Sequence, residues 1–144
     1  MAISRAGYVL RCDATWSKIV RAVDGACVLC LSTERPTCGH LFSRTSYGTR
    51  YHPMNSWQQC CGCNMRHEHD AYPFNHWFIE RFGLTAWDDL HALASRPSHV
   101  KTWMLADTWK MMTELLQEVE KSGMDRETLD QRAEAWGKYF WTTA

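Results

Sequence analysis

The sequence predicts a mainly helical α+β protein, and two observations lead to that prediction. Apolar side chains recur at helical spacing near the N-terminus and from Pro73 onward, whereas residues 26–70 follow neither a helical nor a strand period. A chain of 144 residues has the length of one domain with a modest core. We therefore expect a single domain over 1–144, divided into an N-terminal helix (1–24), a cysteine-rich core (25–70) and a helical region (71–144).

Residues that commonly start or stop helices bound each expected helix. Asp13 can cap a first helix over about 13–23, and the Asp24-Gly25 pair can end it. The same signals predict four helices downstream: about 75–82 before Gly83, Thr85 to about Ser95, Ser98 to about Ser122 before Gly123, and a last one from Asp125.

Composition limits the class of protein. No apolar run approaches the roughly 18 residues of a membrane span, and the first residues lack the apolar centre of a signal peptide. We therefore expect a cytoplasmic protein, in which reduced thiols make the seven cysteines candidates for metal binding rather than disulfides. The net charge is zero, but residues 1–69 carry 8 basic against 4 acidic side chains. An anionic partner would dock on this half.

Two C-x-x-C pairs, Cys27 with Cys30 and Cys60 with Cys63, have the spacing of a zinc site. A two-residue gap lets both thiolates reach one ion, and two pairs complete a tetrahedral site with Zn–S distances of about 2.3 Å. Such a closed site leaves no open coordination position, so we expect one structural Zn²⁺ that does no chemistry. Alternatives use Cys38, His40 or Cys61 as a ligand, whereas Cys12 is expected to be a small buried side chain.

Polar residues between and after these pairs suit phosphodiester hydrolysis. A neutral His40 could take a proton from water, and the side-chain oxygen of Asn64 could bind a hard cation such as Mg²⁺. If a helix begins at the second pair, His67 lies near Asn64 on its first turns. Arg44 and Arg50 flank a Gly-Thr turn that follows His40, where guanidinium groups would suit phosphate oxygens. Simpler roles remain open, including a structural His40, a turn at Asn55 and a helix cap at Asn64.

Three segments of the centre carry a family resemblance: GHLFSR at 39–44, RYHPMN at 50–55 and CCGCN at 60–64. In this order they resemble the His-Me finger (HNH) endonucleases, and most of all the phage recombination proteins of the NinG (Rap) type. The four-cysteine site followed at once by an asparagine is also similar to phage junction resolvases of the endonuclease VII type. With looser similarity upstream and downstream, the resemblance covers most of the chain.

The resemblance implies a zinc-pinned ββα-metal fold, in which a hairpin carries His40 and the following helix carries Asn64. The hairpin histidine would be the general base, Asn55 would orient it, and Asn64 would bind the catalytic metal. His67 would be a second helix residue at the phosphate or the metal. Arg66 joins Arg44 and Arg50 as an expected DNA contact.

The function implied by the resemblance is a metal-dependent DNA endonuclease with a structural Zn²⁺ and a catalytic Mg²⁺ or Mn²⁺. It would be a phage-encoded protein acting in the bacterial host on branched DNA such as Holliday junctions, and a homodimer would suit a symmetric junction. Gly39 occupies the position where many such enzymes have an acidic or histidine ligand, so the first metal ligand is unassigned and His52 and His67 are alternative bases. The competing expectation is a catalytically silent zinc module that binds nucleic acid or a protein.

Overall fold

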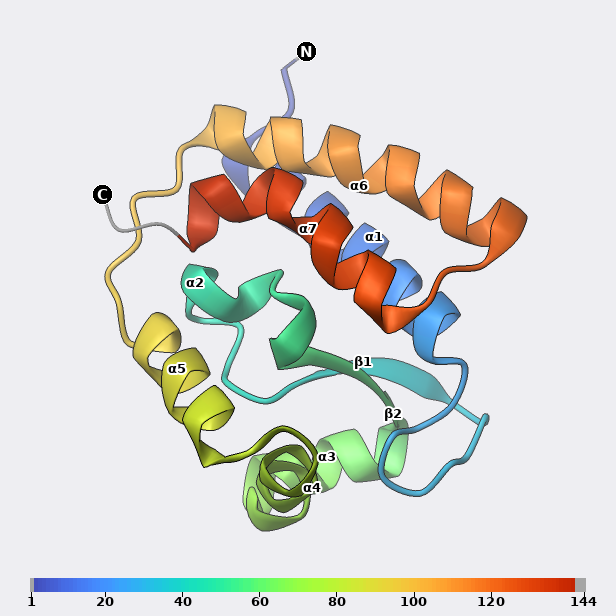
Figure 1. Ribbon diagram of the computed structural model, residues 1–144. Coiled ribbons are helices and arrows are strands. Elements are labelled where there is room, and N and C mark those ends of the chain that lie inside the picture. Colours follow the sequence, from blue (N-terminus) through green and yellow to red (C-terminus); the bar gives the residue numbers. More distant parts are fainter. Residues whose placement is uncertain (1, 142–144) are drawn as a thin grey trace.

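The structure, a computed structural model, describes residues 2–141 as a mainly helical chain with one small sheet (Figure 1). The predicted coarse class, mainly α with a minor β part, is confirmed. No helix in the described range has both the length and the apolar character needed to cross a membrane. The elements are α1 (Arg5–Asp24), β1 (Pro36–His40), α2 (Tyr47–Arg50), a 3-10 turn (Pro53–Asn55), β2 (Ser56–Cys60), α3 (Cys61–His69), α4 (Tyr72–Phe82), α5 (Leu84–Ala94), α6 (Thr102–Ser122) and α7 (Arg126–Phe140).

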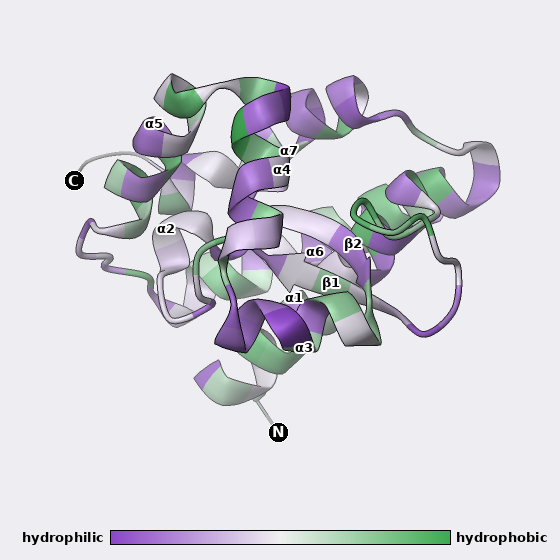
Figure 2. Cartoon of the chain, turned by 90° about the horizontal axis from the view of Figure 1, so that it is seen from below, coloured by the Kyte–Doolittle hydropathy of each residue, from purple (hydrophilic) through white to green (hydrophobic). Residues whose placement is uncertain are grey.

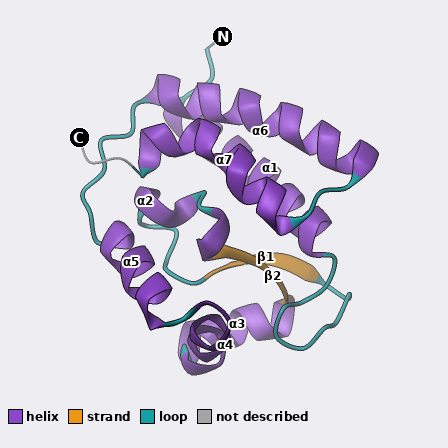
Figure 3. Cartoon of the chain, in the orientation of Figure 1, coloured by secondary structure: helices purple, strands orange, loops and turns teal. Residues whose placement is uncertain are grey.

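Strands β1 and β2 pair antiparallel and lie between two groups of helices. Helices α1, α6 and α7 are on one side, and α3 and α4 are on the other (Figures 1 and 3). The register places Thr37 opposite Gln59 and Gly39 opposite Trp57. Directly opposite residues of an antiparallel pair project to the same face, so these four share the face toward α3 and α4. The face toward α1 carries Cys38, His40, Ser56 and Gln58.

Two apolar clusters fill the two sides of the sheet. The larger lies among α1, α6 and α7, where the rings of Trp16 and Trp136 meet edge to face at 5.7 Å between centroids. The smaller one packs Trp57 of β2 against Phe74 and Phe78 of α4. The hydroxyl of Ser56 accepts a 2.9 Å hydrogen bond from the Trp16 indole, which ties the sheet to the larger cluster.

Helix α1 begins at Arg5 rather than at Asp13, so the predicted Asp13 cap is wrong. Ser4 is the cap, and its hydroxyl accepts a 3.0 Å hydrogen bond from the Gly7 backbone. Asp13 instead lies in the middle of the helix, where its carboxylate accepts hydrogen bonds from the Arg50 guanidinium at 2.6 and 2.9 Å and from the Tyr51 hydroxyl at 2.8 Å. Asp13 thus links α1 to Arg50 and Tyr51 instead of capping the helix.

The later helices follow the predicted order, with three starts displaced, and α4 begins at Tyr72 rather than at about residue 75. Helices α4 and α6 end before glycines with φ of 90° and 70°, a backbone conformation that glycine adopts without strain. Asp125 caps α7 as predicted, with its carboxylate 2.8 Å from the Thr128 N–H. Helix α6 begins at Thr102 instead of Ser98, and the position that caps α5 is Gly83 rather than Thr85.

An ion pair that is largely shielded from solvent joins α1, α7 and the sheet. The Arg126 guanidinium donates to both carboxylate oxygens of Asp24 at 2.8 Å, and one of these oxygens also accepts the backbone N–H of Gln58. The same guanidinium donates to the carbonyl oxygens of Pro53 and Ser56 and stacks on the Trp57 ring at 3.6 Å. Three segments far apart in the sequence therefore meet at one pair of charges.

We predict that Asp24→Ala lowers the free energy of unfolding by about 3–5 kcal/mol, because it leaves the Arg126 charge buried without its partner. Urea unfolding of the metal-loaded protein measures this loss. The exposed Glu118–Arg132 pair, with an N–O distance of 2.6 Å, gives a matched control. Glu118→Ala is expected to change stability far less, because solvent screens that pair. Equal losses in the two variants would show that burial of the Asp24 pair carries no special weight.

Candidate functional site

Four cysteine side chains gather at the end of the sheet. The sulfur atoms of Cys27, Cys30, Cys60 and Cys63 all lie within 4.8 Å of one another, and those of Cys30 and Cys60 are 3.7 Å apart. Four sulfurs placed tetrahedrally around zinc at about 2.3 Å are separated by about 3.8 Å. The predicted four cysteines therefore form a cluster that could hold one structural metal ion, and it is the sole group of its kind in the described range.

Backbone geometry shapes both cysteine pairs. The first pair lies just after α1. Leu31, which follows Cys30, has a positive φ of 67°, and a 2.8 Å hydrogen bond from the Cys27 N–H to the Ser32 carbonyl oxygen closes the turn that holds the pair. The second pair spans the junction of β2 and α3. There the sulfur of Cys60 accepts the backbone N–H of Cys63 at 3.4 Å. The first turn of α3 is thus built around the cluster.

The thiols inside and outside the cluster differ in acidity. Burial alone would raise the pKa of Cys27, but surrounding N–H groups outweigh it and lower the pKa to about 7. Burial raises the pKa of Cys63, which therefore favours its neutral form when no cation is present. Burial likewise raises the pKa of Cys12 and of Cys38 to about 12, and both lie outside the cluster. Cys61 also lies outside it, with its sulfur 3.6 Å from that of Met65.

His40 is the last residue of β1, and its ring is held by the backbone. Its Nε2 is 3.1 Å from the carbonyl oxygen of Arg50. A carbonyl oxygen only accepts, so Nε2 carries the proton and Nδ1 keeps a lone pair. Burial, helped by the charge of Arg44, lowers the pKa of His40 to about 4. The imidazole is therefore neutral at pH 7, as a general base must be.

Asn55 is fully buried and fixes the backbone near His40. Its side-chain oxygen accepts the Phe42 N–H at 2.7 Å, while its NH₂ group donates to the carbonyl oxygens of Phe42 and Thr49. These contacts hold both ends of the loop between the strands. Thr49 directly precedes Arg50, whose carbonyl oxygen binds the His40 ring. The Asn55 amide therefore positions His40 through the backbone, without a direct hydrogen bond to it.

Asn64 and His67 lie three residues apart on α3, and they contact β1 and the residue that follows it. The Asn64 NH₂ group donates to the Thr37 hydroxyl at 3.1 Å, which leaves its carbonyl oxygen for another partner. His67 Nε2 donates to the carbonyl oxygen of Leu41 at 3.1 Å, so its Nδ1 keeps a lone pair. That Nδ1 is buried and has no hydrogen-bond partner among the described residues. Metal-binding histidines are commonly held in this way, with the other ring nitrogen donating to a carbonyl.

His40 and the α3 residues approach β1 from opposite faces. Thr37, which contacts Asn64, faces α3, whereas Cys38 packs into the larger apolar cluster on the side of α1. By strand alternation His40 faces the α1 side. His40 and Asn64 are therefore not placed around one shared position, whereas Asn64 and His67 lie on the same side of the sheet.

The three arginines expected to contact DNA differ in exposure. Arg50 is 14% exposed and is bound to Asp13 at 2.6 Å. Arg44 is 58% exposed, and its nearest carboxylate oxygen, also of Asp13, is 3.5 Å away. Arg66 on α3 is 65% exposed and lies 3.5 Å from Asp70. Arg44 and Arg66 are thus accessible to an anion, whereas the Arg50 guanidinium serves an internal ion pair.

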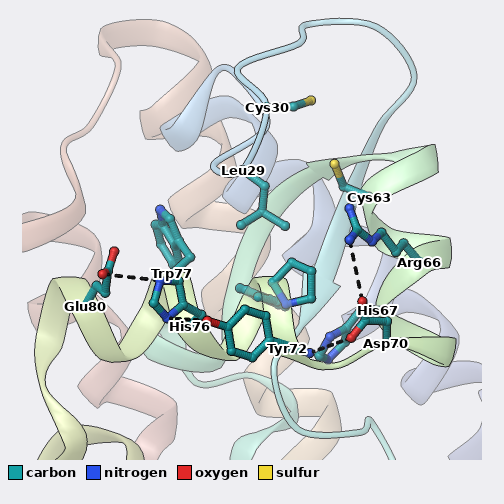
Figure 4. A pocket seen from close by; sticks show the side chains of 12 residues that line it. Leu29, Cys30, Cys63, Arg66, His67, Asp70, Tyr72, His76, Trp77 and Glu80 are labelled. Atoms are coloured by element: carbon teal, nitrogen blue, oxygen red, sulfur yellow. Dashed lines mark hydrogen bonds and ion pairs between the residues drawn. The ribbon is translucent and has the colours of Figure 1, made fainter.

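A cavity of about 490 Å³ opens between the first cysteine pair, α3 and α4, lined by Arg66, His67, Tyr72 and Trp77 among others (Figure 4). Within its lining, Arg66 forms an ion pair with Asp70, and His76 Nε2 lies 3.2 Å from a carboxylate oxygen of Glu80. In the view from below, α3 lies in front of the sheet and much of it is hydrophilic (Figure 2).

No family model, curated protein or solved structure matches this chain. Two polar residues of the site were not predicted from the sequence. Asp13 binds Arg50, and Gln59 is fully buried in β2 with both amide atoms unpaired within the described chain. The sequence contains no local signal for either, since each depends on strand or helix pairing.

We predict that Cys27→Ser loses bound zinc and melts at a lower temperature, because the ion would bridge segments that the unfolded chain does not bring together. Metal content by plasma mass spectrometry and thermal unfolding measure the two effects. Cys61→Ser is the matched control, because Cys61 is next to a cluster residue but outside the cluster. Equal zinc loss in both variants would contradict the assigned ligand set.

Proposed function

We propose that the protein is a metal-dependent DNA endonuclease that nicks branched recombination intermediates such as Holliday junctions in a phage-infected bacterial cell. The observation that carries the proposal is the state of His40: a neutral imidazole with Nε2 bound to a carbonyl and a lone pair on Nδ1. The cysteine cluster and the order of β1, β2 and α3 support a zinc-pinned hairpin and helix, the ββα-metal arrangement implied by the resemblance. A structural Zn²⁺ would hold this unit together.

In the proposed reaction His40 Nδ1 takes a proton from water as the water oxygen bonds to phosphorus. The phosphodiester bond on the opposite side of phosphorus breaks, and the leaving oxygen is protonated by solvent. When bound at Asn64 and His67, Mg²⁺ or Mn²⁺ would supply positive charge near the phosphate and the leaving oxygen. The attacking and leaving oxygens lie roughly in line on opposite sides of phosphorus. For a phosphate at the end of β1, a base on one face of the strand would therefore serve the attacking water, and a cation on the other face would serve the leaving oxygen.

The exposed arginines fit a DNA partner at this position. Arg44 is close enough to His40 to lower its pKa, and Arg66 lies on α3 together with Asn64 and His67. A homodimer would present two such sites to a four-way junction.

We predict that the zinc-loaded protein nicks four-way DNA with Mg²⁺ or Mn²⁺, and that His40→Ala lowers the rate about 100-fold or more, because the base is lost. Gel assays on four-way, flap and linear DNA measure the rate. His52→Ala is the matched control: burial lowers the pKa of His52 to about 4 as well, but its Nδ1 accepts the Met54 N–H and its ring packs on Trp141.

The same assay tests the competing interpretation. Gly39 offers no side-chain ligand, which favours a silent zinc module that binds nucleic acid. Zinc-loaded wild type that binds four-way DNA but cuts none of these substrates would support that module and overturn the endonuclease. If His52→Ala abolishes nicking and His40→Ala does not, the base is misassigned.

We predict that Arg44→Ala reduces the slope of log Kd against log salt concentration for DNA by about 1, as expected for one lost phosphate contact. Fluorescence anisotropy at several salt concentrations measures the slope. Arg50→Ala is expected to leave the slope unchanged and to lower stability by roughly 3 kcal/mol, because it removes the two guanidinium hydrogen bonds to the mostly buried Asp13 carboxylate. The reverse pattern would remove Arg44 from the DNA interface and add Arg50 to it.

A further inference from the structure

Gln59 is a fully buried polar side chain in β2 without a partner. Neither its Oε1 nor its Nε2 makes a hydrogen bond within the described part of the chain. Buried amides are nearly always paired, because the unpaired state forfeits the hydrogen bonds that water would provide. A side chain of this length could be replaced by an apolar one at less cost. Its amide therefore indicates a ligand that accepts from Nε2 and binds Oε1.

The space for the Gln59 amide is created by Gly39. A Cβ added to Gly39 would lie 2.6 Å from both Cδ and Oε1 of Gln59, closer than such atoms approach in folded proteins. Every other residue type at position 39 would therefore displace the amide. On this face of β1, which is opposite to the face that carries His40, the polar group is therefore supplied by the neighbouring strand instead of by residue 39.

The Gln59 amide lies on the same face of the sheet as Asn64 and His67. Gln59 is opposite Thr37, and the Thr37 hydroxyl both accepts from the Asn64 NH₂ group and donates to the backbone carbonyl oxygen of Gln59 at 2.8 Å. His67 contacts the Leu41 carbonyl oxygen, one residue after the end of β1. These two hydrogen bonds of α3 are therefore on either side of Gly39, the residue over which the Gln59 amide lies.

We propose that Gln59 Oε1 is a third protein ligand of the divalent cation, together with the Asn64 side-chain oxygen and His67 Nδ1. Amide oxygens suit Mg²⁺ and Mn²⁺, and an imidazole nitrogen is compatible with Mn²⁺. Gln59 Nε2 would donate to a water that the cation retains. The presence of the cation rests on the proposed function. In this assignment β2 supplies, through Gln59, the ligand that Gly39 of β1 lacks.

The test compares Gln59→Met with Gln58→Met in zinc-loaded protein. Methionine keeps the volume but removes the amide, and Gln58 is an equally buried glutamine on the opposite face of β2. Titration with Mn²⁺, followed by the electron paramagnetic resonance signal of the free ion, measures affinity. We expect Gln59→Met to weaken Mn²⁺ binding roughly tenfold or more, and Gln58→Met to leave it unchanged.

Thermal unfolding without Mn²⁺ separates a ligand from a structural glutamine. Removal of an unpaired buried amide is expected to leave the melting temperature of Gln59→Met equal to that of wild type or above it. A glutamine that only supports the fold would give a lower melting temperature with unchanged Mn²⁺ affinity, and that result would overturn the proposal.

An exchange of side chains between the two strands gives a second, independent test. Gly39→Asp alone is expected to lower the melting temperature, because the new Cβ meets the Gln59 amide. Combined with Gln59→Ala, the aspartate has room, and its carboxylate is expected to restore Mn²⁺ binding relative to Gln59→Ala alone. A double variant that folds but binds Mn²⁺ no better than Gln59→Ala would count against the site.

Nicking assays on the same proteins keep the two proposals apart. Wild type that binds Mn²⁺ through Gln59 but cuts no DNA would leave the ligand assignment standing and overturn the endonuclease. Wild type that nicks DNA, with Gln59→Met binding Mn²⁺ and nicking equally well, would leave the endonuclease standing and overturn the ligand assignment. Wild type that binds no Mn²⁺ at millimolar concentration would overturn the ligand assignment as well.

Discussion

The ion pair between Asp24 and Arg126 holds the helical layer and the sheet in one arrangement. It joins the end of α1, the start of α7 and the backbone of β2 through charges that have little access to water. Neither charge can be removed alone without leaving the other buried, so the three segments depend on each other. Because Cys27 follows Asp24 by three residues, the same pair also sets where the first cysteine pair begins.

The sheet is too small to be stable by itself, since it consists of two strands of five residues. Helices therefore cover both of its faces, and the cysteine cluster closes one end. This arrangement gives each face a different set of polar groups. A neutral imidazole, His40, projects toward α1, whereas an asparagine, a histidine and a glutamine gather toward α3. For the proposed reaction, this separation would place proton removal and cation binding on two sides of one phosphate.

The features predictable from the sequence were those with local causes. The cysteine spacing identified the four members of the cluster, and the glycines after α1, α4 and α6 have the left-handed or otherwise positive φ that ends a helix. Asp13 was misassigned because its real partner, Arg50, is 37 residues away, and helix-start statistics contain no information about it. The face on which His40 lies could not be predicted from the sequence either. It depends on the register of β1 with β2, and a shift of one residue would reverse it.

The junction between β2 and α3 also determines how the site can move. Helix α3 has nine residues and is anchored to the cysteine cluster only at its first turn. It is about 13 Å long, so a slight tilt at the anchored end becomes a larger displacement toward His67 and beyond. The hydrogen bonds from Asn64 to Thr37 and from His67 to the Leu41 carbonyl oxygen oppose such a tilt, so they fix the direction of the helix that the cysteine cluster anchors.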